Sequence, residues 1–200
     1  MGWRLNGFTI LVILLTYSLS GNGVTEERDK WQQPEKIMDT LNIRPGMVVG
    51  EVGAGEGYFT FKLAGRVGPS GHIYANDIVQ RLLDQIDDRC RREDIDNITT
   101  ILGKTEQPLF PAAQLDLVVM MRVFHDLASP VNLVNNIIPA LKPGALLVIV
   151  DPDPVKLEKN RNHFYSRQKI LTLMRESKFE LVELLDFLPQ DNIYIYRIRD

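Results

Sequence analysis

The residues of this chain that could do chemistry gather around a short glycine-rich segment, EVGAGEGYF, at positions 51–59. Gly53, Gly55 and Gly57 stand at alternate positions, and Glu51 precedes the first of them by two residues. Glycine costs backbone entropy on folding, so such a cluster indicates a turn in which the backbone approaches a ligand closely. The alternative is that the glycines serve only a tight turn between a strand and a helix.

The spacing of these glycines bears on the kind of ligand. A dinucleotide-binding loop has the pattern G-x-G-x-x-G, which would place the third glycine where this chain has Tyr58. Twenty residues beyond Gly57 comes Asp77, and a carboxylate there can accept hydrogen bonds from both hydroxyls of a ribose. The pattern therefore predicts a ribose-containing ligand and disfavours a nicotinamide oxidoreductase. An exposed carboxylate at a strand end is the alternative for Asp77.

A second group with possible chemistry follows an apolar run at 115–121. A free imidazole titrates near neutrality, so His125 is a candidate to assist substrate positioning or to take a proton from an oxygen or nitrogen acceptor. Alternatively, His125 and Asp126 cap the turn, since adjacency alone does not establish a His–Asp pair. We expect His163 to be solvated. The sequence has no His/Cys cluster at metal-ligand spacing and no G-x-S-x-G elbow, so we expect neither a metal site nor hydrolase chemistry.

The elements that must position these residues alternate along the chain. Sequence patterns predict strands at 47–52, 71–78, 98–103, 115–121 and 145–153, and helices at 31–43, 58–68, 79–94, 129–144 and 161–177. Residues 179–199 are predicted to form two strands, the second an alternating sheet face in IYIYRI. Their short connection requires antiparallel pairing. The whole predicts a Rossmann-like α/β fold: a mostly parallel seven-stranded sheet with a C-terminal antiparallel hairpin and helices on both faces.

This architecture predicts where the ligand binds. In an open parallel sheet, ligands bind beyond the carboxyl ends of the strands, at the point where the strand order reverses. The glycine-rich segment follows the first predicted strand, so it lies at that edge. The helix after it offers free N–H groups and the positive end of its dipole to an anionic ligand group.

Four segments, in their order along the chain, resemble the motifs of the class I methyltransferases that use S-adenosylmethionine. They are VVGEVGAGEGYF, the acidic end of HIYANDI, LDLVVMMRVFHDL and LKPGALLVIVDPD. The terminal FELVELLDFLPQDNIYIYRI is similar to the closing antiparallel hairpin of that family. The likeness extends from about residue 31 to 199. It implies S-adenosylmethionine as the cofactor and methyl transfer as the activity.

The resemblance also implies roles for single residues. Glu51 shapes the loop and faces the methionine ammonium, Asp77 binds the ribose, and Ile78 packs on the adenine. The implied cofactor contacts are Glu51, Gly53, Ala54, Gly55, Gly57, Asp77, Ile78, Met121 and Arg122. Met121 and Arg122 line the methionine side, although Arg122 can equally be a surface charge.

One departure from the family pattern concerns the adenine. The family often has Gly-Asp after the third strand, and the carboxylate region contacts the adenine amine. This chain has Gly103 and Lys104 there, followed by Thr105 and Glu106. Either Glu106 or a backbone carbonyl is expected to make the contact.

Composition limits the partners. The chain has 200 residues, 44% of them hydrophobic, and a net charge of -3. This length and balance are typical of one globular domain, expected here at 24–200. The slight acidity gives no electrostatic footprint for nucleic acid. Cys90 is the only cysteine, in a charged segment expected to be a solvated helix face, so no intrachain disulfide is possible.

The N-terminus differs from the rest. Residues 1–23 combine Arg4, a short apolar run from Phe8 to Leu15, and small residues, which is typical of a secretory signal peptide. The run is shorter than the roughly 20 residues that a bilayer requires. We therefore expect an exported or periplasmic protein. An uncleaved anchor, which would be the chain's one contact with a membrane, and a buried or interfacial helix of a cytoplasmic protein are the alternatives.

The methyl acceptor has no signature in the sequence. The predicted acceptor side is short, which suggests a compact site, so we expect a small-molecule acceptor. A binding module of the same fold that has lost turnover is the alternative, because an exported protein would leave the compartment in which S-adenosylmethionine is made.

Overall fold

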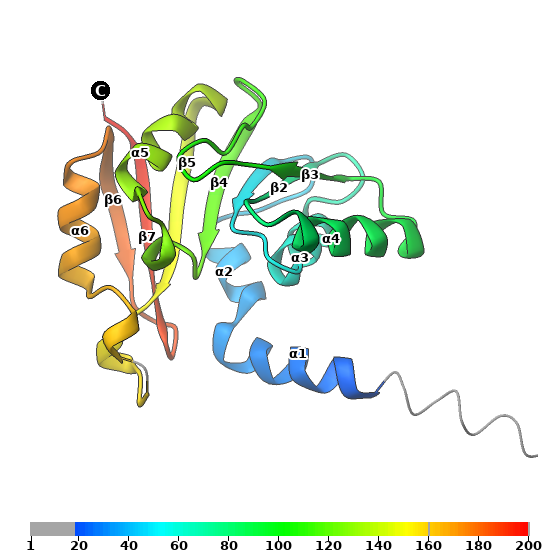
Figure 1. Ribbon diagram of the computed structural model, residues 1–200, viewed down its shortest axis with the longest axis horizontal. Coiled ribbons are helices and arrows are strands. Elements are labelled where there is room, and N and C mark those ends of the chain that lie inside the picture. Colours follow the sequence, from blue (N-terminus) through cyan, green and yellow to red (C-terminus); the bar gives the residue numbers. More distant parts are fainter. Residues whose placement is uncertain (1–18, 160, 200) are drawn as a thin grey trace, which may run out of the picture.

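The computed structural model describes residues 19–159 and 161–199 (Figure 1). The predicted signal peptide, residues 1–23, lies outside this part of the chain except for its last five residues, which begin helix α1 (Leu19–Gln32). Its role as a signal stays a prediction. None of the helices within the described ranges has the length and apolar character that a bilayer crossing requires.

A seven-stranded sheet forms the centre of the molecule, in the order β3-β2-β1-β4-β5-β7-β6. The strands are β1 (Val48–Val52), β2 (His72–Asp77), β3 (Ile98–Leu102), β4 (Leu115–Met121), β5 (Leu141–Pro152), β6 (Phe179–Leu185) and β7 (Asp191–Ile198). The first five strands pair in parallel, and β7 runs antiparallel between β5 and β6. The predicted fold class is confirmed, and the order reverses beside β1, where the glycine loop begins.

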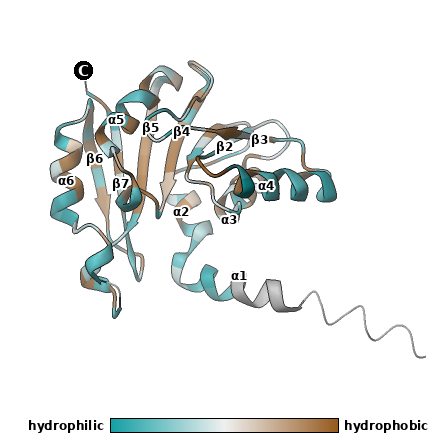
Figure 2. Cartoon of the chain, viewed as in Figure 1, coloured by the Kyte–Doolittle hydropathy of each residue, from teal (hydrophilic) through white to brown (hydrophobic). Residues whose placement is uncertain are grey.

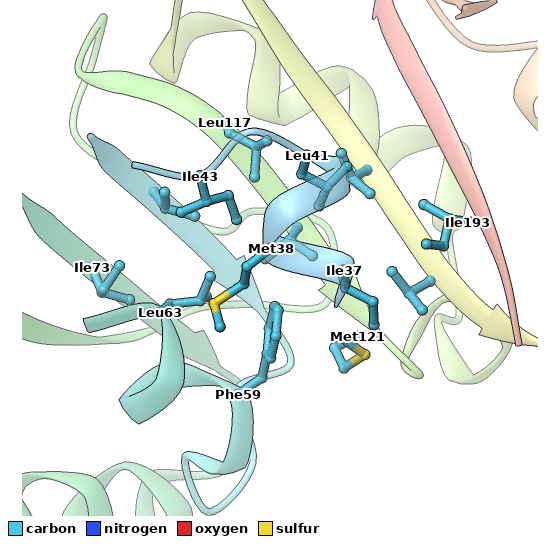
Figure 3. Close-up of a cluster of buried hydrophobic side chains, with 14 of the residues drawn as sticks. Ile37, Met38, Leu41, Ile43, Phe59, Leu63, Ile73, Leu117, Met121 and Ile193 are labelled. Atoms are coloured by element: carbon cyan, nitrogen blue, oxygen red, sulfur yellow. The ribbon is translucent and has the colours of Figure 1, made fainter. Parts of the chain in front are cut away.

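Helices cover both faces of this sheet. The remaining α-helices are α2 (Pro34–Thr40), α3 (Tyr58–Val67), α4 (Gln80–Glu93), α5 (Pro130–Ile137) and α6 (Arg167–Arg175). Ile37 and Met38 of α2 and Phe59 and Leu63 of α3 pack together on one face of the sheet, beside Leu117 of β4 (Figure 3). Residues of α5 and α6 build the core on the other face. Figure 2 shows the contrast between the apolar central strands and the hydrophilic outer side of α4.

Strand β7 is buried on both faces rather than on one. Tyr194 and Tyr196 point into one core and Ile193 and Ile195 into the other, so the alternation in IYIYRI separates two apolar surfaces. The reason is the position of β7 between β5 and β6, with helices on either side.

Three helices have bounds that differ from the predicted ones, and two of them are described first. The helix predicted at 31–43 is interrupted at Gln33, which has a left-handed φ of 49° directly before Pro34. The helix predicted at 161–177 is α-helical only from Arg167, because the Ser166 side chain caps its N-terminus by accepting from the amide of Lys169 at 3.2 Å.

The largest correction concerns the helix predicted at 129–144. Helix α5 ends at Ile137, and after one short 3₁₀ turn the chain enters β5 at Leu141. Pro139 cannot donate a helical N–H, and Leu141 pairs with Leu115 of β4. The sheet therefore takes the residues that the pattern assigned to the helix.

Candidate functional site

The loop after β1 and the N-terminal part of α3 form one wall of a cavity of about 670 Å³. The residues that line it are Arg28, Glu51, Gly53, Ala54, Gly55, Glu56, Tyr58, Phe59, Phe61, Lys62, Arg89 and Met121. Of the predicted cofactor residues, Glu51, Gly53, Ala54, Gly55 and Met121 thus come together in one place. The sequence prediction had assigned them to the methionine half of the cofactor and to the loop beneath it.

The glycines of this loop are required by its geometry. Gly53 has a φ of 73°, and a Cβ there would lie 2.5 Å from a methyl carbon of Val123. Gly57 has a φ of 85°, and a Cβ would lie 2.6 Å from the ring of Phe61. Gly55 also has a positive φ, 56°, but open space around it. The backbone of Gly55 is therefore accessible to a ligand, while its two neighbours keep the turn tight.

Asp77 organises the same loop from β2. Its carboxylate accepts hydrogen bonds from the amides of Gly55 at 2.9 Å and of Val79 at 3.0 Å. The side chain is buried and lines a second cavity, of about 290 Å³. Each carboxylate oxygen has a further lone pair, so both ribose hydroxyls can still bind. The predicted ribose contact stays a prediction, and the structure adds a role in holding the loop.

The second cavity is lined by Ile78, whose contact with the adenine stays a prediction. Ile78, 60% exposed, stands at its edge with Lys104 and Thr105, and Gly53 lines both cavities. A cofactor that extends across Gly53 would place one half in each cavity. Glu106 does not line either cavity; its carboxylate accepts from the Asn132 amide at 3.2 Å at the start of α5. Lys104 and Thr105 line the second cavity instead, and the residue that contacts the adenine amine stays a prediction.

Glu51 is a carboxyl group with little contact with water. It is 1% exposed, and its Oε2 accepts from the Thr60 hydroxyl at 2.5 Å. Burial raises the pKa of Glu51 to about 8, although the Thr60 hydrogen bond and Arg28 oppose the shift. A cationic ligand group beside Glu51 would favour its ionised form. The predicted contact of Glu51 with the methionine ammonium stays a prediction.

We expect Glu51→Gln to weaken S-adenosylmethionine binding by about 10- to 150-fold, since one charge-assisted hydrogen bond is lost. The pH dependence of stability should change as well. The folded carboxyl loses its proton near pH 8, whereas an unfolded glutamate loses it near 4.5. The parent therefore loses stability as pH rises between these values, and the variant should lose less. Melting temperatures at pH 5 and pH 8.5 measure this, and equal slopes would contradict the assignment.

Cationic and aromatic side chains that the sequence prediction did not include complete the first cavity. The guanidinium of Arg28 lies 3.5 Å from the centre of the Tyr58 ring, and Asp29 accepts from the Tyr58 hydroxyl at 2.5 Å and from Lys62 at 2.7 Å. These contacts join α1 to α3. Arg28 and Lys62 fit a ligand that carries a carboxylate, as a methionine moiety does. The charged run EERDK just before the predicted first helix was the signal that could have found Arg28.

Arg122 has a different environment from the one predicted. Its guanidinium pairs with Asp191 at 2.5 Å and lies 4.8 Å from the Trp31 ring, and it does not line either cavity. Asp191 is fully buried; burial raises its pKa to about 6, and the charge of Arg122 opposes that rise. Arg122 thus neutralises a buried acid at the carboxyl edge of the sheet. Its contact with the cofactor stays a prediction.

His125 has a buried carboxylate partner. It lies in a short 3₁₀ turn directly after β4, and its Nδ1 is 2.9 and 3.1 Å from the two carboxylate oxygens of Asp151 on β5. Burial raises the pKa of Asp151, and the hydrogen bond from His125 opposes this. A carboxylate only accepts hydrogen bonds, so Nδ1 carries a proton, and in the neutral imidazole Nε2 keeps a lone pair for a ligand. The adjacent Asp126 lies on the Nε2 side, at 3.4 Å.

Sheet order, closing hairpin and glycine loop together define the Rossmann-like methyltransferase class of folds. Residues 43–188 match the family model described as a methyltransferase domain, and the chain belongs to that family. S-adenosylmethionine is its cofactor. The predicted family and its cofactor are confirmed, and the acceptor is not identified by this match.

The names of similar proteins refer to different methyl acceptors. A protein-L-isoaspartate O-methyltransferase of Methanothrix thermoacetophila is 32% identical over 113 residues, 56% of this chain and 51% of that protein. A demethylmenaquinone methyltransferase of Geobacillus sp. is 24% identical over 136 residues, 68% and 57% of the two chains. The chain spans about half the length of the curated relatives it matches. A methyltransferase structure from Aquifex aeolicus superposes with a TM-score of 0.79 at 21% identity, covering 86% of this chain and 92% of that one.

Proposed function

We propose that this protein transfers the methyl group of S-adenosylmethionine to a small-molecule acceptor held beside the carboxyl ends of β4 and β5. The observation that carries the proposal is the pair of cavities that meet at Gly53, with the His125–Asp151 pair on the next strands of the same sheet edge. Family membership supports turnover over a binding module of the same fold.

Methyl transfer requires mainly that the protein position the acceptor. The cofactor supplies a methyl group activated by its sulfonium. A lone pair on the acceptor forms the new bond to the methyl carbon while the carbon–sulfur bond breaks and its electrons pass to sulfur. Holding the acceptor in line can contribute about 7–11 kcal/mol of barrier lowering. His125 is placed to orient the acceptor or to receive its proton on Nε2, and Asp151 stabilises the imidazolium that results.

Methyl-labelled S-adenosylmethionine tests the proposal on the full chain. We expect label to pass to a compound in the small-molecule fraction of a cell extract, and not to the protein or lipid fractions. Asp77→Ala, which removes a side chain from the cofactor site, is the variant that should lose transfer. His72→Ala changes an imidazole at the opposite end of β2 and should keep it. If label appears in the protein fraction alone, the acceptor is a protein and not a small molecule. If the cofactor binds tightly and label passes to no fraction, the protein is a binding module.

A further inference from the structure

Three side chains with metal-ligating atoms meet beside the acceptor edge. They are His125 and Asp126, in the turn after β4, and His163, in a short 3₁₀ turn that follows β5. One ligating atom from each lies within 4.8 Å of the others. His125 and His163 are 38 positions apart in the sequence, which is why no motif spacing revealed the group.

With neutral imidazoles, the contacts within this group leave a place for a cation. The Nδ1 proton of His125 is donated to Asp151, so the Nε2 lone pair faces outward. What it faces is the carboxylate of Asp126, at 3.4 Å. The other carboxylate oxygen of Asp126 lies 3.4 Å from Nε2 of His163. A neutral imidazole lone pair and a carboxylate are both acceptors, and 3.4 Å exceeds the usual 2.7–3.2 Å of an N–H···O hydrogen bond.

The 3.4 Å separations between the histidine nitrogens and the Asp126 oxygens fit tetrahedral better than octahedral coordination. Zinc–nitrogen and zinc–oxygen bonds of about 2.0–2.1 Å place neighbouring ligand atoms of a tetrahedron about 3.3–3.4 Å apart. Octahedral coordination with bonds of about 2.1 Å gives about 3.0 Å. Each His–Asp separation matches an edge of the tetrahedron, but His125 contacts one carboxylate oxygen of Asp126 and His163 contacts the other. Asp126 is 57% exposed, so a rotation of its carboxylate would bring one oxygen within reach of both imidazoles. His163 is 58% exposed, so its ring can turn to shorten the remaining edge.

The surroundings of His125 resemble the support that zinc-binding histidines have. Metal-ligating histidines commonly donate their other ring N–H to a carboxylate, which fixes the tautomer and the ring orientation. Asp151 does this for His125 and is itself fully buried. The ring of Phe164 packs edge-on against both imidazoles, at centroid distances of 4.7 Å to His125 and 4.9 Å to His163.

We propose that His125, Asp126 and His163 bind one divalent transition-metal ion of the zinc type, in tetrahedral coordination. Three protein ligands leave the fourth position open, as in catalytic rather than structural zinc sites. Asp126 and Asp77 both line the 290 Å³ cavity, so the ion would lie at the edge of that cavity.

The ion gives the acceptor a defined place, and this part of the inference rests on the proposed function. An oxygen, nitrogen or sulfur atom of the acceptor binds the open position and loses its proton to water more readily than when free. The methyl group then passes to that atom as above. Metal binding occupies Nε2 of His125, so His125 acts as a metal ligand that positions the acceptor and not as the proton acceptor.

Cobalt(II) titration of the full chain tests metal binding without any acceptor. We expect one equivalent to give the visible absorption of tetrahedral cobalt, and zinc to displace it. His163→Ala should weaken binding by at least about 100-fold, because loss of a ligand costs more than loss of a supporting contact, which costs about 10- to 100-fold. Asp151→Asn keeps all three ligands, so its affinity for cobalt should be lower than that of the parent by only about 10- to 100-fold. Equilibrium binding of S-adenosylmethionine to His163→Ala should match the parent.

The control is His72→Ala, which removes the chain's other histidine, far from the group on β2, and should bind cobalt as the parent does. Three results would overturn the inference: a parent that takes up neither cobalt nor zinc, a His163→Ala variant that binds as tightly as the parent, and a His72→Ala variant with an equal loss. Failure of metal binding with normal methyl transfer would leave the proposed function standing. Metal binding without methyl transfer would support the metal site and contradict the proposed function.

Discussion

His125→Asn should lower the rate of methyl transfer by about 10²- to 10⁴-fold, equivalent to about 3–5 kcal/mol of barrier. The imidazole stands at the end of β4 with Nε2 directed away from Asp151, and asparagine offers neither a titrating group nor a lone pair at that place. The same loss is expected whether the imidazole receives a proton or holds a metal ion. The measurement is the transfer rate at saturating cofactor, with the acceptor found by labelling.

Two controls separate chemistry from structure in this variant. Affinity for S-adenosylmethionine should stay within about twofold of the parent, because His125 does not line the cavity around Glu51. The asparagine amide can still donate to Asp151 from about the position of Nδ1, but loss of the buried ring removes packing, and a large-to-small change of this kind lowers stability. Rates must therefore be compared well below the melting temperature. A lower melting temperature with normal turnover, or a loss of cofactor affinity, would show that His125 has a structural role only.

The second large effect is expected at the ribose. Asp77→Ala should lower affinity for S-adenosylmethionine by about 10- to 150-fold for each charge-assisted hydrogen bond that is lost. The variant also leaves the amides of Gly55 and Val79 without their acceptor, so the glycine loop loses order at the same time. Isothermal titration of parent and variant measures the change.

Asp77→Asn separates the two roles of this carboxylate. Its side-chain carbonyl can still accept from one of the two amides, but the negative charge is gone. We expect an affinity between those of the parent and the alanine variant, and a melting temperature closer to the parent. If Asp77→Ala binds the cofactor as tightly as the parent, the assignment of Asp77 to the ribose is wrong.

Local patterns were sufficient to predict much of the fold. The apolar run at 115–121 predicted the bounds of β4. The loop spacing with Asp77 at the end of the second strand indicated a ribose-containing ligand, and the resemblance to the class I methyltransferases indicated the cofactor. The short connection between the last two strands was sufficient to predict an antiparallel hairpin. The strand and the hairpin depend on contacts within one element or between adjacent elements, which periodicity and loop length report well. Asp77 and the loop lie 22 residues apart, and only their known spacing connected them.

What the sequence did not reveal depends on contacts between distant segments. The partner of His125 is Asp151, 26 residues away and on the next strand, and not the adjacent Asp126. Arg28 joins the first cavity because Asp29 ties α1 to Tyr58 and Lys62. Residues 141–144 left the predicted helix because β4 was available for pairing. Tertiary pairing of this kind overrides local preference and has no periodic signature.

Glu51 and Asp191 are both buried acids whose pKa values are raised by their surroundings, and both lie at the edge of the sheet where the cofactor and acceptor are expected. Each makes the ligand-free protein less stable than a site of apolar residues would. Burial is the main cause for both acids, and Arg122 already compensates Asp191. A cationic ligand group beside Glu51 would offset the cost of burying that carboxylate, so folding and ligand capture become parts of one equilibrium. Cellular abundance of this protein would then follow the supply of its ligands, since molecules without them unfold and are degraded more often.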